Sequence, residues 1–101
     1  MASEEIVKKY TNSPIWITGI GQKTTSAGFT KNISLTSMES TVIAGQSALK
    51  MSNHNISEID VAEVHDAFSV CEPMALESLG FTNPGQGINM VQKLHEEDNF
   101  M

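Results

Sequence analysis

The chain has 101 residues, of which 40% are hydrophobic, and a net charge of −6. Its hydrophobic content is too high for a disordered chain, and its length allows one small domain or a piece of a larger one. The acidic balance and the scattered Lys and Arg residues disfavour nucleic acids and anionic membranes as partners. The single cysteine, Cys71, excludes a disulfide within the chain and a cysteine-based metal motif.

The polar segment "MASEEIVKKYTNS", residues 1–13, is interpreted as an N-terminal extension or linker. It precedes one partial domain over residues 14–101. Ser3 is placed to cap a short helix in the extension. Pro14 ends that helix, because the residue before a proline avoids helical geometry.

A buried strand is predicted for residues 15–18, "IWIT", because these residues are β-branched or aromatic. Gly19 and Gly21 are expected to end it. The run over residues 23–32 is rich in Thr, Ser and Gly and predicts a loop.

A helix is predicted over residues 37–51, where apolar residues recur at helical spacing. Thr36 and Glu39 have the spacing of a capping box at its start. Gly45 weakens the helix by roughly 1 kcal/mol relative to alanine. A small residue there indicates a close approach by a neighbouring element.

A second buried strand is predicted from Ile59 to Phe68, which is apolar nearly throughout. The next helix is expected to begin near Ser69, which forms a second capping-box pattern with Glu72, or to carry Pro73 in its first turn. Gly80 ends this helix, and "INMVQKLHEED" predicts a short final one.

The order strand, helix, strand, helix predicts an α/β fold with a parallel strand pair and a right-handed crossover. Two strands do not make a stable sheet and leave an unpaired edge. We therefore expect a partner chain or a homo-oligomer to cover it.

Three stretches of the sequence resemble the thiolase family, in particular its archaeal and sterol-carrier-protein branch. They are "PIWITGIGQKT", "IDVAEVHDAFSVCEPMALESLGF" and "LGFTNPGQG", and the similarity covers roughly residues 14–87. The resemblance implies part of the family's C-terminal domain. It also implies an acyl-CoA acyltransferase that performs Claisen condensation or thiolysis of a 3-ketoacyl-CoA. Coenzyme A thioester would be the substrate, without a tightly bound cofactor.

The "VHDAF" stretch matches the family's catalytic signature of this branch. His65 would then help to form the oxyanion hole for the thioester carbonyl, directly or through a water. Asp66 would orient His65 or its loop, and Phe68 would support the site by packing beside it. From residue types alone, a satisfied histidine next to a helix cap explains His65 and Asp66 equally well.

The family's nucleophilic cysteine region, Gly-His-Pro motif and Cys-Gly motif do not occur in these 101 residues. Cys71 matches neither family cysteine and is interpreted as a small buried hydrophobe rather than a nucleophile. We therefore expect a fragment or one subunit of a split enzyme, inactive without other thiolase segments or subunits. The alternatives are a non-catalytic interaction or scaffolding module, or a small acyl or lipid carrier.

No metal site is expected, since His54, His65 and His95 lack ligand spacing. No apolar run approaches the roughly 20 residues that span a bilayer. The first residues, "MASEEIVKKY", lack the apolar stretch of a signal peptide. With a lone cysteine, these features predict a cytoplasmic protein.

Overall fold

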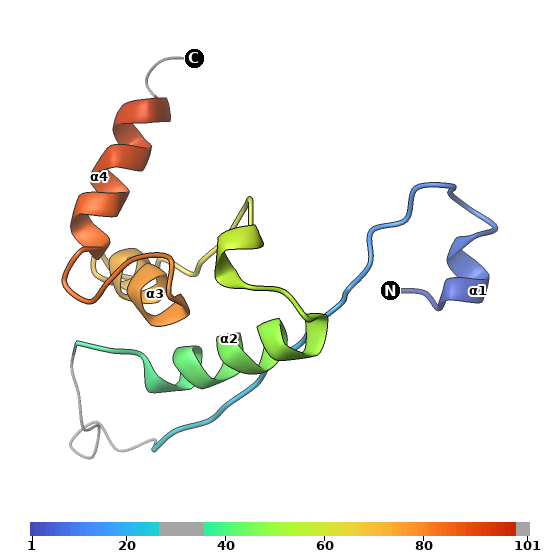
Figure 1. Ribbon diagram of the computed structural model, residues 1–101, viewed down its shortest axis with the longest axis horizontal. Helices are drawn as coiled ribbons and strands as arrows, with labels where there is room; N and C mark the ends of the chain where they lie inside the picture. The colour runs from blue at the N-terminus through green and yellow to red at the C-terminus, as the bar shows by residue number, and fades with distance from the viewer. Residues whose placement is uncertain (27–35, 99–101) are drawn as a thin grey trace.

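The computed structural model describes residues 1–26 and 36–98. Helices are the regular elements of this part of the chain, and none of them is long and apolar enough to cross a membrane. In chain order they are α1 (Glu4–Val7), α2 (Glu39–Ser52), the 3-10 turn η2 (Ile56–Glu58), α3 (Cys71–Leu79) and α4 (Gly87–Asp98) (Figure 1).

The prediction of an α/β fold with a parallel strand pair is wrong, because residues 1–26 and 36–98 contain no strand. Residues 15–18 and most of residues 59–68 instead run as open chain without a ladder of hydrogen bonds to each other (Figure 1). The preference of β-branched residues for extended backbone is local. A strand also requires a neighbour to exchange N–H and C=O bonds with. Within the described residues neither segment has one.

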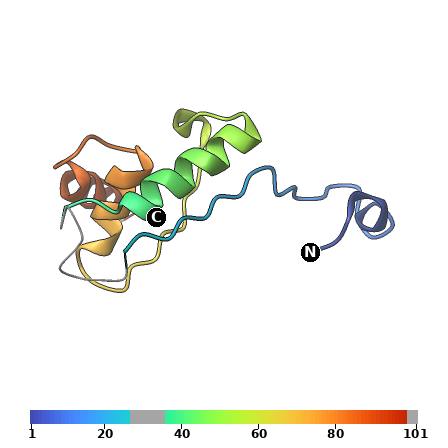
Figure 2. The ribbon, with the colours of Figure 1, turned by 90° about the horizontal axis from the view of Figure 1, so that it is seen from below.

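The first open segment lies along α2 in both views of the ribbon (Figures 1 and 2). A Cβ at Gly19 would collide with the carbonyl oxygen of Ala48, and one at Gly21 with that of Ala44. The sequence suggested only that the two glycines end a segment, and the structure gives them a second role. They let the backbone approach one side of α2 more closely than any side chain would permit.

Gly21→Ala is expected to lift this segment from α2 and to lower the free energy of unfolding by about 1–3 kcal/mol, as overpacking does elsewhere. The neighbouring Thr18 is exposed, so Thr18→Ala should change stability by less than about 0.5 kcal/mol. Chemical denaturation of the three proteins provides the comparison. Equal midpoints for Gly21→Ala and the parent chain would show that the close approach contributes nothing.

Helix α3 is central, with α2 on one side and α4 on the other (Figure 1). Ala75 and Leu76 of α3 are the buried apolar core of the described residues. A Cβ at Gly45 of α2 would lie 2.7 Å from Cδ2 of Leu79. The predicted close approach at Gly45 is thus confirmed, and α3 is the element that makes it.

Two neighbouring residues of α3 fix the starts of the adjacent helices. The Ser78 hydroxyl accepts a hydrogen bond from the backbone N–H of Met38, directly before α2, at 3.1 Å. The Glu77 carboxylate accepts one from the N–H of Gly87, the first residue of α4, at 2.7 Å. The first N–H groups of a helix have no partner within it. α3 therefore supplies acceptors to both of its neighbours.

Both capping boxes predicted from the sequence are wrong. α2 begins at Glu39 behind Met38, α3 begins at Cys71 behind Val70, and neither helix has a side-chain cap from its own N-cap residue. The acceptor at the start of α2 comes from Ser78, 40 residues away in the chain. Spacing between neighbours in sequence cannot reveal a partner at that distance.

The predicted end of α3 at Gly80 and the position of Pro73 in its first turn are confirmed. Gly80 closes α3 in the left-handed conformation, with φ of 93°, and its N–H bonds to the carbonyls of Leu76 and Glu77. Pro73 lies in the first turn of α3, where the missing N–H costs no intrahelical bond. α4 covers the predicted final helix. The predictions for the first helix are wrong: Ser3 precedes α1 without a side-chain cap, and α1 ends at Val7 rather than at Pro14.

The Glu77 contact predicts a dependence of stability on pH. Backbone N–H groups of Gly85 and Gly87 donate to this carboxylate and hold its pKa below the ordinary value of 4.5. A lowered folded-state pKa adds stability above pH 4.5, and this stability is lost as the pH falls through the folded-state pKa. Glu77→Gln should therefore be less stable than the parent at neutral pH, and the difference should vanish in acid.

Thermal melts from pH 7 to pH 3 measure this difference. Glu63→Gln is the matched control, because Glu63 is exposed and makes no hydrogen bond or ion pair with described residues. It should track the parent at every pH. A Glu77→Gln deficit that stays constant down to pH 3 would show that the ionised carboxylate has no special role.

Large apolar side chains remain exposed on the open segments. Ile15 is 98% exposed and Val61 79% exposed. The radius of gyration is 16.6 Å, whereas a compact chain of this length has one of about 13 Å. The described residues thus form a small helical core with extended apolar arms that are exposed to solvent.

Candidate functional site

The three residues of the signature lie on the connection from η2 to α3. His65 and Asp66 end the open segment, and Phe68 begins the turn into α3. The carbonyl oxygen of Phe68 accepts a hydrogen bond from the Cys71 N–H at 2.7 Å, which turns the chain into the helix. The expectation that the signature precedes a helix start is therefore met, although the segment before it is not a strand.

The signature side chains face outward. His65 and Asp66 are exposed, and within residues 1–26 and 36–98 neither makes a hydrogen bond or an ion pair. Phe68 is 74% exposed. The three residues are close neighbours along the chain, and all three are exposed. They form an open surface with one donor ring, one carboxylate and one aromatic ring.

Cys71 is the first residue of α3 and is half-buried as a free thiol. The described part of the chain contains no group of three His, Cys, Asp or Glu residues that could hold a metal ion. His54 lies 3.7 Å from Glu58, between Nδ1 and Oε1, at η2 and away from the signature in the sequence.

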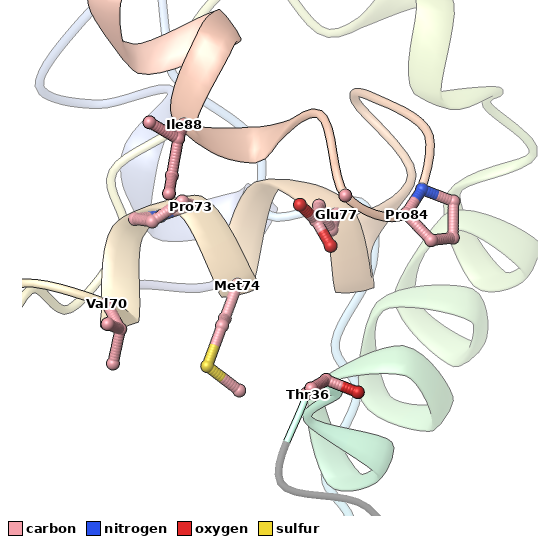
Figure 3. Close-up of a pocket in the computed structure, with 8 residues that line it drawn as sticks. Thr36, Val70, Pro73, Met74, Glu77, Pro84 and Ile88 are labelled. Atoms are coloured by element: carbon pink, nitrogen blue, oxygen red, sulfur yellow. The ribbon is translucent and has the colours of Figure 1, made fainter.

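A cavity that the sequence did not suggest lies beside α3. Its volume is about 540 Å³. Val70, Met74 and Glu77 follow one another at intervals of four and three residues, so they share one side of the helical segment. This spacing is the one signal in the sequence that points to the wall of the cavity. The cavity is lined by Thr36, Val70, Pro73, Met74, Glu77, Pro84, Gly85 and Ile88 (Figure 3).

Comparison with known proteins identifies the relatives of the chain. The family described as "Thiolase C-terminal domain-like" matches residues 21–99. An acetyl-CoA acetyltransferase of Methanothermobacter thermautotrophicus is 31% identical over 83 residues, which are 82% of this chain and 22% of that protein. An acetyl-CoA acetyltransferase of Methanocaldococcus jannaschii is 32% identical over 89 residues, or 86% of this chain and 23% of that protein.

The chain thus spans less than a quarter of the length of these two curated relatives. The family match includes His65, Asp66 and Phe68, α2, α3 and α4. The resemblance drawn from the sequence is confirmed. The chain belongs to the thiolase family, as a segment related to its C-terminal domain.

Proposed function

We propose that this chain supplies part of the C-terminal domain of a thiolase-like acyl-CoA acyltransferase. The complete enzyme would catalyse Claisen condensation of acyl-CoA thioesters or thiolysis of a 3-ketoacyl-CoA. The observation that carries the proposal is the family match over residues 21–99, which contains the whole "VHDAF" stretch. Both relatives are named acetyl-CoA acetyltransferases, which supports a coenzyme A thioester as the substrate.

His65 is assigned the oxyanion-hole role. A ring N–H of its imidazole would donate to the thioester carbonyl oxygen, directly or through a water, where negative charge develops. Such a donor is typically worth about 3 kcal/mol in the transition state. The exposed position of His65 leaves its ring free of competing bonds with described residues. It therefore remains available for a substrate that other segments bring to it.

Asp66 and Phe68 are assigned supporting roles. Asp66 would orient His65 or the connection that carries it, and Phe68 would pack beside the site once other protein covers it. Phe68 is 74% exposed here, and a ring of that size gains most of its stabilisation only when buried. The arrangement supports a site that is completed by contact with further thiolase segments.

The domain limits proposed from the sequence place an extension at residues 1–13 and the partial domain at residues 14–101. In both ribbon views α1 stands apart from the other helices at the end of an open segment (Figures 1 and 2). The close packing of Gly19 and Gly21 on α2 supports counting the open segment with the domain.

The isolated chain is expected to show no thiolase turnover. A donor for the oxyanion cannot replace the nucleophile that carries the acyl group. The thiolase nucleophile region has no counterpart in these 101 residues. An assay of 3-ketoacyl-CoA cleavage with the purified chain tests this. Turnover that Cys71→Ser abolishes would contradict the proposal and make Cys71 the nucleophile.

A non-catalytic interaction module is the second candidate, and the exposed apolar arms at Ile15 and Val61 favour it. Such a module would keep the family architecture and bind a partner without chemistry. The open reading frames next to the gene for this chain distinguish the split enzyme from the interaction module. A cysteine-bearing thiolase half upstream, or a Gly-His-Pro segment downstream, supports the enzyme. Their absence supports the module.

A further inference from the structure

The cavity beside α3 shares no lining residue with the signature. One wall is the α3 segment, with Val70, Met74 and Glu77 (Figure 3). The turn after α3 and the first turn of α4 contribute Pro84 and Ile88. His65, Asp66 and Phe68 do not line it. Its volume of about 540 Å³ falls within the roughly 300–1,000 Å³ of small-molecule sites.

The cavity has apolar walls and one fixed negative charge. Among its lining residues, Glu77 is the only one with a charged side chain. The Gly87 N–H holds Oε1 of Glu77 at 2.7 Å, and donation from Gly85 and Gly87 keeps its pKa below the ordinary range. The carboxylate is therefore ionised at neutral pH and held in place. A ligand would meet apolar surface along most of its length and a carboxylate at one point.

We propose that this cavity binds a small apolar molecule that carries one cationic group, of which an arylalkylamine is the simplest form. The apolar body would displace water from Val70, Met74 and Ile88, and the ammonium group would face Glu77. An anionic molecule of the same shape would be repelled by the carboxylate of Glu77. The charge on Glu77 therefore sets which ligands the cavity accepts.

An amide NMR titration of the full chain tests the proposal with three probes of matched skeleton. Phenylbutylamine should shift amides within residues 70–88 and bind at least about tenfold more tightly than phenylbutyrate, since one charge contact of this kind changes affinity by about that factor. Phenylbutanol should lie between the two. Equal affinities for the amine and the acid, or shifts confined to residues other than Thr36 and residues 70–88, would overturn the proposal.

Ile88→Lys tests the role of Glu77 by placing an ammonium group in the cavity that competes with the amine probe. Ile88 is 63% exposed, so a lysine is tolerated there, and its ammonium group can pair with Glu77 and occupy the cavity. The affinity for phenylbutylamine should fall at least about tenfold. Ile6→Lys on α1 makes the same change of charge at a residue that is 49% exposed and does not line the cavity. It should bind like the parent.

Val70→Lys repeats the test from the α3 wall, so that a folding defect in one variant does not decide the outcome. Circular dichroism establishes that each variant keeps the helical content of the parent. Unchanged amine binding in both folded lysine variants would overturn the proposal. The titration involves no acyl transfer, so its failure leaves the thiolase assignment intact, and a failure of the turnover assays leaves the cavity assignment intact.

Discussion

His65→Ala is expected to lower kcat by about a hundredfold to a thousandfold in an enzyme completed around this segment, the usual loss when one oxyanion-hole donor is removed. A suitable enzyme is a chimera in which residues 21–99 of this chain replace the matching segment of the Methanothermobacter relative. The physical reason is that the imidazole N–H is needed most where charge develops on the thioester oxygen. Steady-state condensation of acetyl-CoA measures the effect.

His54→Ala is the matched control for this experiment. His54 is also an exposed histidine, but it lies at η2 beside Glu58 and has no counterpart in the proposed mechanism. The chimera with His54→Ala should keep the kcat of the parent chimera. If His65→Ala and His54→Ala gave the same kcat in folded proteins, His65 would be a surface histidine and the oxyanion assignment would be wrong.

The isolated chain is expected to form a dimer or a larger assembly. Ile15 is 98% exposed and Val61 79% exposed on segments without a partner among the described residues. Burying apolar surface gains roughly 25 cal/mol per Å², and a stable interface needs about 1,000 Å² or more. The net charge of −6 opposes association weakly, because the Debye length is about 8 Å at physiological salt.

Ile15→Lys should weaken this association at least about tenfold, because a buried ammonium group without a partner is costly. Gln46→Lys makes the same change of charge at an exposed polar position of α2, and it should leave the association unchanged. Sedimentation over a wide concentration range compares the three proteins. A compact monomer at high concentration would show that the apolar arms need no cover.

The helices were predictable from the sequence because their signals are local. Residues 37–51 carry an apolar stripe at helical spacing, and the structure has a helix at Glu39–Ser52. Gly80 stops α3 because it adopts a positive φ, which glycine does without steric cost. Such features depend on residues within one or two turns of each other, so sequence patterns reveal them.

The strand prediction was wrong and the cavity was not predicted, because strands and cavities depend on contacts between distant parts of a chain. Residues 15–18 have strand-forming side chains, but a ladder needs a neighbour that the described residues do not provide. The Ser78 contact to Met38 joins positions 40 residues apart. The cavity combines side chains from several segments of the chain. The signature could be located at His65 and Asp66 because it is a run of neighbouring residues.

Complementation in trans tests the central assignment most directly. The purified chain is mixed with an N-terminal thiolase half that carries the nucleophilic cysteine, and acetyl-CoA condensation is measured with and without each component. The thiolase assignment predicts turnover in the mixture, none in either component, and a loss of turnover when the chain carries His65→Ala. A mixture that forms a complex but shows no condensation, or one whose turnover is independent of His65, would contradict it.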